Sequence, residues 1–407
     1  MTEVTKYIRA NWENAIHQPN NVTRGIIRMP VPFSVPCADG CFSDFYYWDT
    51  YFADLGLLLD GHIQQVYNNL DVMAYFIRYL GYVPNSNHII DRSQPPLFAR
   101  GVYDLYRYTG NKEVIGRYIG AILDEYLFFR YDRMTPCGLN AYSTYTPRAM
   151  LLRHYPWLSE RVGIFCATEE EKIGLCKQLL SIAESGWDFN PRFRTEKAPF
   201  AVEEFAHLDL NCLLYDMERK TAEMLEAVGR KESDEFYRYA EQRAEKMRRC
   251  MRDANTGIYY DYNFKSNSFS SVLSCASFYP YAVGLEKESG PLLTILELLE
   301  LPYGLAACEY RGEQEKYYQW DYPSMWPTNV YFAYEALMAV GEREAAERIA
   351  AKYRRTVEAV FEQTGSLWEK YDAKKGDVSC TSEYETPRMM GWTAGVYRYL
   401  EEQSGRR

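Results

Sequence analysis

The chain has 407 residues, of which 47% are hydrophobic and 25% are charged. This composition predicts a globular protein with a large core and excludes an intrinsically disordered chain. The formal net charge of −10 repels nucleic-acid phosphates and anionic lipids, so we expect neither nucleic acid nor a membrane as a partner.

Aromatic residues are unusually frequent. They make up 16% of the chain, with 37 Tyr and 8 Trp. Tyrosine combines an apolar ring with a hydroxyl group, which suits a pocket that stacks on sugar rings and binds their hydroxyls. A core that uses Tyr in place of Leu and Phe explains the same composition, so both interpretations remain open.

The N-terminal residues 1–20 contain no basic start followed by an apolar stretch, which predicts that no secretory signal is present. The ten cysteines are scattered, and only Cys37 and Cys41 are closely spaced, so a zinc site is not expected. Free thiols are typical of a reducing compartment, and we therefore predict a cytoplasmic protein. The five histidines have no ligand spacing, and neither a metal nor an organic cofactor is expected.

Helical periodicity dominates the chain. It predicts helices at 65–80, 100–109, 113–129, 170–184, 214–228, 232–252, 290–300, 329–340 and 345–360. Gly229 is a plausible end for the fifth of these. Alternating strand patterns are few and short. No linker or shift in composition divides the chain, so we predict one all-α domain over residues 1–407.

A weak internal repeat suggests how the helices are arranged. Three helices are followed by a glycine turn and then, in two of the three cases, by an aromatic residue, within the segments 135–138, 255–260 and 364–368. This pattern favours a ring of helical hairpins whose connecting loops gather at one end.

Six segments break the amphipathic pattern by bringing Trp, Asp, Glu, Arg and Gln together, in several cases beside Gly or Pro. Loops of this kind are where a rigid scaffold usually carries its functional residues. The segments are Phe45–Tyr51, Asp91–Pro96, Glu184–Phe189, Gln319–Pro323, Trp368–Asp372 and Ser382–Tyr384.

Two carboxyl groups in these segments suit glycoside hydrolysis, which needs a protonated acid and an ionised base on either side of one bond. Asp188 lies between Trp187 and Phe189, and apolar neighbours raise the pKa of a carboxyl group. Glu369 is followed by Lys370, which favours an anion. Each carboxylate alone has an equally simple interpretation as a helix cap or the partner of an arginine.

The segments, in this order, resemble those of the trehalases and related α/α-toroid glycosidases. The resemblance covers Phe42 to Val396 and rests on the motifs Tyr47-Trp48-Asp49, Arg92-Ser93-Gln94-Pro95-Pro96, Ser185-Gly186-Trp187-Asp188-Phe189, Gln319-Trp320-Asp321 and Gly391-Trp392-Thr393. It implies an (α/α)6 barrel, in agreement with the helical pattern.

The resemblance also implies roles for individual residues. It assigns the general acid to Asp188 and the general base to Glu369, with Glu383 as second choice for the base. Arg148 matches a substrate-binding arginine of the family, and Glu383 matches a binding glutamate near the mouth of the site. The remaining residues implied to bind the sugar are Phe42, Trp48, Asp49, Asn85, Arg92, Gln94, Gly186 and Trp320.

The implied reaction is inversion, in which water held by Glu369 attacks the anomeric carbon opposite Asp188. The two carboxyl groups should then lie about 6.5–9.5 Å apart, to leave room for that water. The expected partner is a small α-glycoside, with α,α-trehalose as the first choice. No cofactor is implied.

The sequence departs from the family pattern in four places. Cys41 replaces an arginine, Met150 replaces a glutamate, the segment from Asn85 to Arg92 is two residues short, and the segment 376–382 before Glu383 has a single glycine. Loss of the arginine and the glutamate removes hydrogen-bonding groups and should weaken binding of the leaving group. A glucosylglycerate, a mannosylglycerate or another α-glucobiose is therefore an alternative substrate. A non-catalytic sugar-binding protein and a glycoside phosphorylase are the alternatives from other functional classes.

Overall fold

The computed structural model describes residues 1–19, 27–38, 40, 42–314, 317–379 and 383–405. Within these residues the chain is mainly helical. The α-helices are α1 (Glu3–Asn11), α2 (Tyr47–Leu59), α3 (Ile63–Leu80), α4 (Phe98–Thr109), α5 (Glu113–Asp132), α6 (Arg148–Val162), α7 (Glu169–Glu184), α8 (Leu208–Ala227), α9 (Ser233–Cys250), α10 (Tyr279–Ala282), α11 (Ser289–Leu299), α12 (Pro327–Ala339), α13 (Arg343–Thr364) and α14 (Gly391–Gly405).

The strands are two residues long and pair antiparallel near the connections. They are β1 (Ile16–His17) with β2 (Phe33–Ser34), β3 (Phe205–Ala206) with β4 (Tyr262–Asn263) and β5 (Ser268–Phe269), β6 (Glu300–Leu301) with β7 (Gly304–Leu305), and β8 (Ser324–Met325) with β9 (Tyr371–Asp372).

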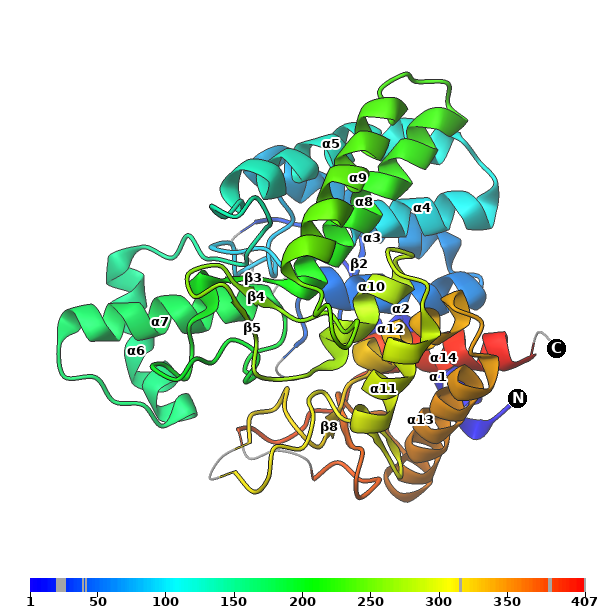
Figure 1. The fold of residues 1–407 in the computed structure, drawn as a ribbon. Coiled ribbons are helices and arrows are strands. Elements are labelled where there is room, and N and C mark those ends of the chain that lie inside the picture. The colour runs from blue at the N-terminus through cyan, green and yellow to red at the C-terminus, as the bar shows by residue number, and fades with distance from the viewer. Residues whose placement is uncertain (20–26, 39, 41, 315–316, 380–382, 406–407) are drawn as a thin grey trace.

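Six helices form a closed inner ring. Each packs against the next in the order α2, α4, α8, α10, α12 and α14, and α14 packs back against α2. The helices α3, α5, α9 and α13 each follow an inner helix in the chain and pack on its outer side, as α8 and α9 do side by side in Figure 1. This arrangement confirms the predicted toroid of helical hairpins.

The ring closes through a glycine contact between α2 and α14. A Cβ atom on Gly395 would lie 1.8 Å from the carbonyl oxygen of Phe52, so only a glycine lets the two helices approach this closely. Nearby, the Arg398 guanidinium donates to the Asp60 carboxylate at 2.8 Å, which joins the C-terminal helix to the end of α2. The two ends of the described chain lie on the same side of the molecule (Figure 1).

The outer helices lie where the periodicity of apolar residues predicted them. Two inner helices, α2 and α14, show no such periodicity. In α2 every residue from Tyr47 to Leu58 is buried, and residues 391–398 of α14 are buried as well. A helix surrounded by protein on all sides has no polar face, so hydrophobic periodicity does not reveal it. As a result, α2 begins inside a segment that the sequence suggested was a loop, Phe45–Tyr51, and α14 lies where no helix was predicted.

The helices α6 and α7 are inserted between the outer helix α5 and the inner helix α8, and they project from the ring (Figure 1). They share a separate apolar cluster that includes Leu158, Leu179 and Phe193. Thr168 and Glu171 form a capping box at the start of α7. This helix pair leads directly into the segment that carries Asp188.

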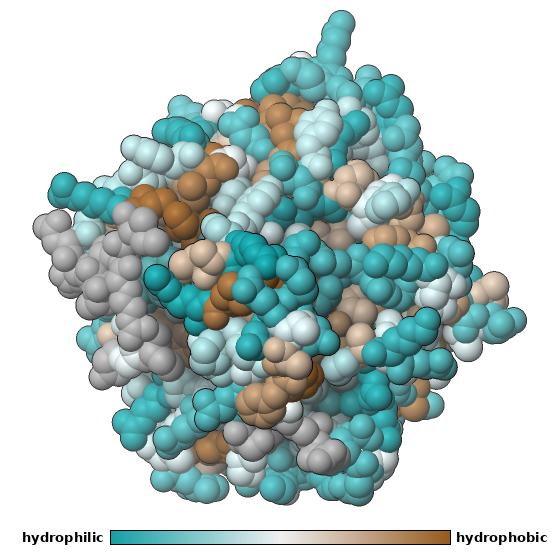
Figure 2. Space-filling view, turned by 90° about the vertical axis from the view of Figure 1, so that its left-hand side faces the viewer, coloured by the Kyte–Doolittle hydropathy of each residue, from teal (hydrophilic) through white to brown (hydrophobic). Residues whose placement is uncertain are grey.

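On the face from which α6 and α7 project, hydrophilic residues cover most of the surface and apolar residues form small separate groups (Figure 2). Across the described ranges, no helix is both long enough and apolar enough to span a bilayer.

Candidate active site

The candidate site lies where the connections lead into the inner helices. Trp48 and Asp49 occupy the first turn of α2. Asp188 lies in the connection between α7 and α8, and Glu369 lies in the connection between α13 and α14. Segments that are far apart in the sequence therefore meet because each precedes or begins a helix of the same ring.

These segments enclose a cavity of about 230 Å³. Ten of the twelve residues proposed from the sequence line it, while Arg148 and Glu383 do not. The ten are Phe42, Trp48, Asp49, Asn85, Arg92, Gln94, Gly186, Asp188, Trp320 and Glu369.

Stacked tryptophans form one wall of the cavity. The rings of Trp320 and Trp326 lie parallel, 3.8 Å apart between centroids, and Trp48 tilts against Trp320 at 5.7 Å. Trp392 meets Trp48 edge-on at 5.9 Å. Rigid aromatic surfaces of this kind suit the C–H faces of a sugar ring.

Asp188 faces the cavity with its side chain partly exposed. Burial raises the pKa of the Asp188 carboxyl, and the positive charges of Arg161 and Arg92 oppose that rise. Arg161 lies closest, with Nη1 at 3.3 Å from Oδ2. A carboxyl group with a raised pKa is suited to donate a proton to a leaving oxygen.

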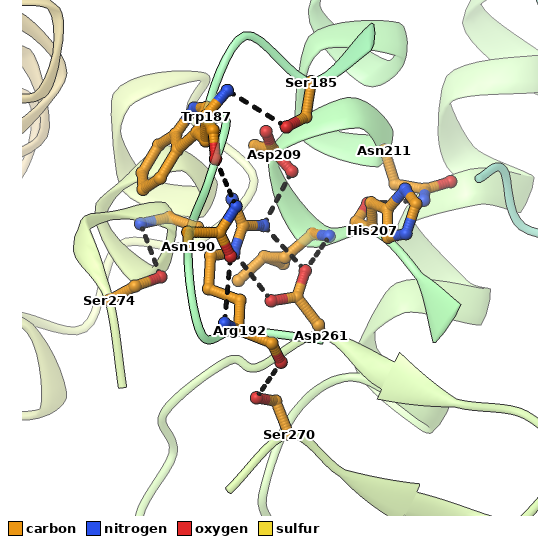
Figure 3. Close-up of polar contacts among 12 residues, drawn as sticks. Ser185, Trp187, Asn190, Arg192, His207, Asp209, Asn211, Asp261, Ser270 and Ser274 are labelled. Atoms are coloured by element: carbon orange, nitrogen blue, oxygen red, sulfur yellow. Dashed lines mark hydrogen bonds and ion pairs between the residues drawn. The ribbon is translucent and has the colours of Figure 1, made fainter. Parts of the chain in front are cut away.

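A buried network holds the backbone on either side of Asp188 (Figure 3). The side-chain amide of Asn190 donates to the carbonyl of Trp187 at 2.7 Å, and the Arg192 amide donates to Asn190 Oδ1 at 2.9 Å. The Arg192 guanidinium, which is fully buried, donates to both Asp209 and Asp261 at 2.8 Å. The guanidinium also lies over the Trp187 ring, 4.6 Å from its centroid. These buried contacts hold the segment that carries Asp188 in position.

Glu369 is held by two partners. Its Oε1 accepts a hydrogen bond from the Tyr384 hydroxyl at 2.7 Å, and its Oε2 pairs with the ammonium group of Lys370. Lys370 is fully buried and lies over the rings of Trp326 and Tyr384. The Tyr384 hydroxyl and the Lys370 ammonium group thus fix the positions of both carboxylate oxygens of Glu369.

Asp49, Arg92 and Gln319 add further polar groups to the cavity lining. Burial raises the pKa of Asp49 well above its usual value, and the charges of Glu369 and Asp188 raise it further. Among the residues that the structure describes, the buried Arg92 Nε and Gln319 Oε1 have no hydrogen-bond partner. Both residues line the cavity, and each keeps one hydrogen-bonding atom that no described residue pairs with.

Glu184 positions the segment that carries Arg92 and Gln94. Its buried carboxylate accepts hydrogen bonds from the amides of Ser93 at 2.8 Å and Ser143 at 2.7 Å, and it pairs with Arg133. Gln94 in turn accepts from the Trp48 amide at 3.1 Å, which caps the first turn of α2. Within the described ranges, no group of three or more His, Cys, Asp or Glu residues is placed to hold a metal ion.

Comparison with known proteins identifies the family of the chain. The sequence profile of the trehalase family matches residues 1–404. The chain belongs to the trehalase family. It is 28% identical to the periplasmic trehalase of Xanthomonas campestris pv. campestris strain 8004, over 97% of this chain and 72% of that protein. It is 30% identical to the periplasmic trehalase of Pseudomonas aeruginosa PAO1, over 91% of this chain and 71% of that protein.

Solved structures share the fold. The neutral trehalase of Saccharomyces cerevisiae superposes with a TM-score of 0.73 at 22% identity, over 98% of this chain and 79% of that one. The GH63 mannosylglycerate hydrolase of Thermus thermophilus superposes with a TM-score of 0.66 at 15% identity, over 98% and 100% of the two chains. As a trehalase-family protein, this chain is a glycoside hydrolase with an α/α-toroid fold.

The prediction of a cytoplasmic location is wrong, because the trehalase relatives are named periplasmic and point to the periplasm. That prediction depended partly on free cysteines. Among the described residues, seven cysteines are free thiols: Cys137, Cys166, Cys176, Cys212, Cys250, Cys275 and Cys308. Four of these thiols are buried, among them Cys212 and Cys308. Burial shields a thiol from oxidants in solution, so free buried cysteines do not by themselves report on the compartment.

In this trehalase-family chain, Arg148 lies away from the cavity, contrary to the expectation from its motif. It is the first residue of α6, its side chain is 53% exposed, and it pairs with Glu169 and Glu170 at the start of α7. Met150 lies in the same turn of α6. Neither position contacts the cavity, so the exchange of glutamate for methionine does not alter the cavity wall.

Two other departures fall partly or wholly outside the described residues. Cys41 is one, and residues 380–382 of the segment before Glu383 are the other. The shortened segment from Asn85 to Arg92 lies wholly within the described residues. It closes on itself through a hydrogen bond from the Asn85 amide to the Arg92 carbonyl at 2.9 Å, which keeps both side chains at the cavity.

Glu383 lies behind the cavity wall. Its side chain is fully buried, and its two oxygens accept from the Gln319 amide and from Arg161 Nε, both at 2.9 Å. The sequence did not suggest that Arg161, Trp157, Tyr384 or Gln319 lines the cavity. Arg161 and Trp157 lie within an ordinary amphipathic helix, where nothing in the local sequence sets them apart. Tyr384 and Gln319 belong to two of the unusual segments and were detectable there.

Proposed function

We propose that this chain is an inverting α-glycosidase that hydrolyses α,α-trehalose to two molecules of glucose, and that residues 1–407 act as one catalytic domain. The observation that carries the proposal is that Asp188 and Glu369 line the same small, tryptophan-walled cavity. Membership of the trehalase family and the trehalase names of the relatives support trehalose as the substrate.

In the proposed reaction, Glu369 removes a proton from a water molecule, and the resulting hydroxide attacks the anomeric carbon. Asp188 donates its proton to the glycosidic oxygen as the bond breaks, so that the second glucose leaves as a neutral alcohol. Asp188 must then be protonated and Glu369 ionised in the resting enzyme. Burial raises the pKa of the Asp188 carboxyl, in the direction that a proton donor requires, and Lys370 pairs directly with Glu369.

The glucose that is attacked would occupy the inner part of the cavity. Trp48 and Trp320 offer apolar surfaces, and Phe42 and the backbone at Gly186 complete the walls. Asp49, Asn85, Arg92 and Gln94 provide polar groups for the hydroxyls. We assign Glu369 rather than Glu383 as the base, since Glu369 lines the cavity and Glu383 is fully buried behind it.

A panel of substrates tests the proposal. Purified protein should release glucose from trehalose faster than from other α-glucobioses, glucosylglycerate or mannosylglycerate, without added phosphate. Release from a glycerate substrate alone would reject trehalose as the substrate. Sugar binding by calorimetry without any product would indicate a non-catalytic protein, and a rate that depends on phosphate would indicate a phosphorylase.

A further inference from the structure

The helix pair α6–α7, residues Arg148–Glu184, contributes Trp157, Arg161 and Ala183 to the cavity lining. Trp157 and Arg161 lie one turn apart on α6, and both line the cavity together with Asp188. The opposite end of α6 is remote from it, because Arg148 pairs with Glu169 and Glu170 on the exposed surface. The inserted helix therefore reaches the cavity with its C-terminal half.

The Arg161 guanidinium contacts both the acid candidate and Glu383. Nε donates to Glu383 Oε2 at 2.9 Å, Nη1 to Asp188 Oδ2 at 3.3 Å, and Nη2 to the Asp188 carbonyl at 3.1 Å. The guanidinium also lies over the Phe189 ring, 4.5 Å from its centroid. Since Asp188 must give its proton to the leaving oxygen, the leaving group has to lie beside Arg161.

Trp157 marks the outer part of the same region. Its side chain is 46% exposed although it lines the cavity, whereas the tryptophans of the inner wall are buried. Its indole N–H donates to His154 Nδ1 at 3.2 Å, and burial lowers the pKa of His154, which keeps this nitrogen available as an acceptor at neutral pH. This hydrogen bond orients the indole ring at the edge of the cavity, where an aromatic ring suits stacking on a sugar.

We infer that the α6–α7 helix pair forms the leaving-group side of the site, where Arg161 and Trp157 bind a neutral, hydroxylated leaving group, and that Arg161 takes the place expected for Arg148. This inference rests on the proposed glycosidase function. It assigns specificity for the leaving group to the inserted helix pair. Specificity for the attacked sugar is assigned to the inner ring of helices and its connections.

The charges around Arg161 select against an anionic leaving group. The guanidinium already faces the carboxyl groups of Asp188 and Glu383, and Asp49 and Glu369 line the same small cavity. A glycerate leaving group would place one more carboxylate beside Arg161, whose positive charge Asp188 and Glu383 already share. Hydroxyl groups avoid this cost, because they accept from Arg161 and donate to the carboxylates.

The experiment compares trehalose with α-glucosyl fluoride in Arg161→Gln, Arg161→Lys and Trp157→Ala. Fluoride departs without a proton from the acid and places no hydroxylated ring on the leaving-group side, so this substrate reports on the inner part of the cavity alone. Arg148→Gln is the matched control, since Arg148 is on the same helix but away from the cavity. Circular dichroism and thermal unfolding confirm that each variant is folded.

For Arg161→Gln we expect kcat/KM for trehalose to fall about 10- to 150-fold, the equivalent of one hydrogen bond to a charged group, with the fluoride rate nearly unchanged. Arg161→Lys should lose less, and Trp157→Ala should raise KM for trehalose by about 2- to 12-fold. Arg148→Gln should match the wild type with both substrates. Wild-type protein should also prefer trehalose to glucosylglycerate.

An equal loss with both substrates would overturn the inference, because Arg161 would then only maintain the cavity. A selective loss of trehalose hydrolysis in Arg148→Gln, or a preference for glucosylglycerate, would overturn it as well. In each of these cases the wild type still hydrolyses glycosides, so the proposed function survives. Wild-type protein that cleaves none of the substrates would reject the proposed function itself.

Discussion

The indole ring of Trp48 packs against the bare Cα of Gly186. A Cβ atom at Gly186 would lie 2.7 Å from Trp48 Cε2, and the Gly186 backbone has a φ of +75° that side chains with L chirality rarely adopt. The contact joins the first turn of α2 to the segment that carries Asp188. The cavity wall and the acid therefore depend on each other for their positions.

Gly186→Ala should lower both stability and activity. The left-handed backbone alone costs an alanine about 1–2 kcal/mol, and the displaced Trp48 ring adds to this. Gly284→Ala is the control, because Gly284 has a φ of +73° with nothing within 4 Å of its Cβ position. Urea unfolding should give a larger loss for Gly186→Ala, and only this variant should lose trehalose hydrolysis. Equal effects would mean that the Trp48 contact is unimportant.

Three carboxylate variants separate the roles of acid, base and binding group. Asp188→Asn should lower kcat for trehalose by about 10²–10⁴-fold while retaining most hydrolysis of α-glucosyl fluoride, which needs no proton. Glu369→Gln should lower both rates, because water must be activated for either substrate. Glu383→Gln should affect trehalose more than the fluoride. If Glu369→Gln stays active and Glu383→Gln is inactive with both substrates, the base is assigned to the wrong residue.

The buried network around Arg192 should be costly to break. Arg192→Met leaves Asp209 and Asp261 as buried charges without their shared partner, for which we expect a loss of about 3–5 kcal/mol in the free energy of unfolding. The exposed pair of Arg230 and Glu232 is the comparison, and Arg230→Met should cost less than about 1 kcal/mol. Similar losses in the two variants, measured by urea unfolding, would argue against this account of the network.

His207 should make stability depend on pH. It is fully buried, and burial lowers its pKa from 6.5 to about 4. The unfolded chain therefore binds a proton between pH 6.5 and 4 that the folded protein does not, so stability falls as the pH falls through this range. From pH 7 to pH 5 the loss attributable to His207 is about 2 kcal/mol. Urea unfolding of His207→Gln at both pH values should show a smaller difference than the wild type, and an equal difference would contradict the assignment.

Much of the fold follows from local patterns. The outer helices α3, α5, α9 and α13 have one apolar face each, and periodicity detects such helices wherever they occur. The inner helices α2 and α14 are buried on all sides and gave no such signal. Only the family resemblance predicted them, because it implied an (α/α)6 barrel, whereas the residues of α2 and α14 show no helical periodicity.

The site was less predictable where it depends on how a helix is oriented. Arg148 matched a family motif, but the first turn of α6 contacts Glu169 and Glu170, so the side chain points away from the cavity. Arg161 reaches the cavity from the other end of α6, and nothing in its neighbours along the chain distinguishes it from a surface arginine. Contacts between distant segments decide both cases. The location was mispredicted for a different reason, since buried thiols carry no information about the compartment.

The stereochemistry of the first product tests most directly whether Asp188 and Glu369 act on opposite sides of one bond. Proton NMR of trehalose hydrolysis, recorded before the anomers interconvert, should show equal amounts of α-glucose from the leaving group and β-glucose from the sugar that water attacks. Initial formation of α-glucose alone would mean retention of configuration, and would contradict a mechanism in which Glu369 directs a single attack by water opposite Asp188.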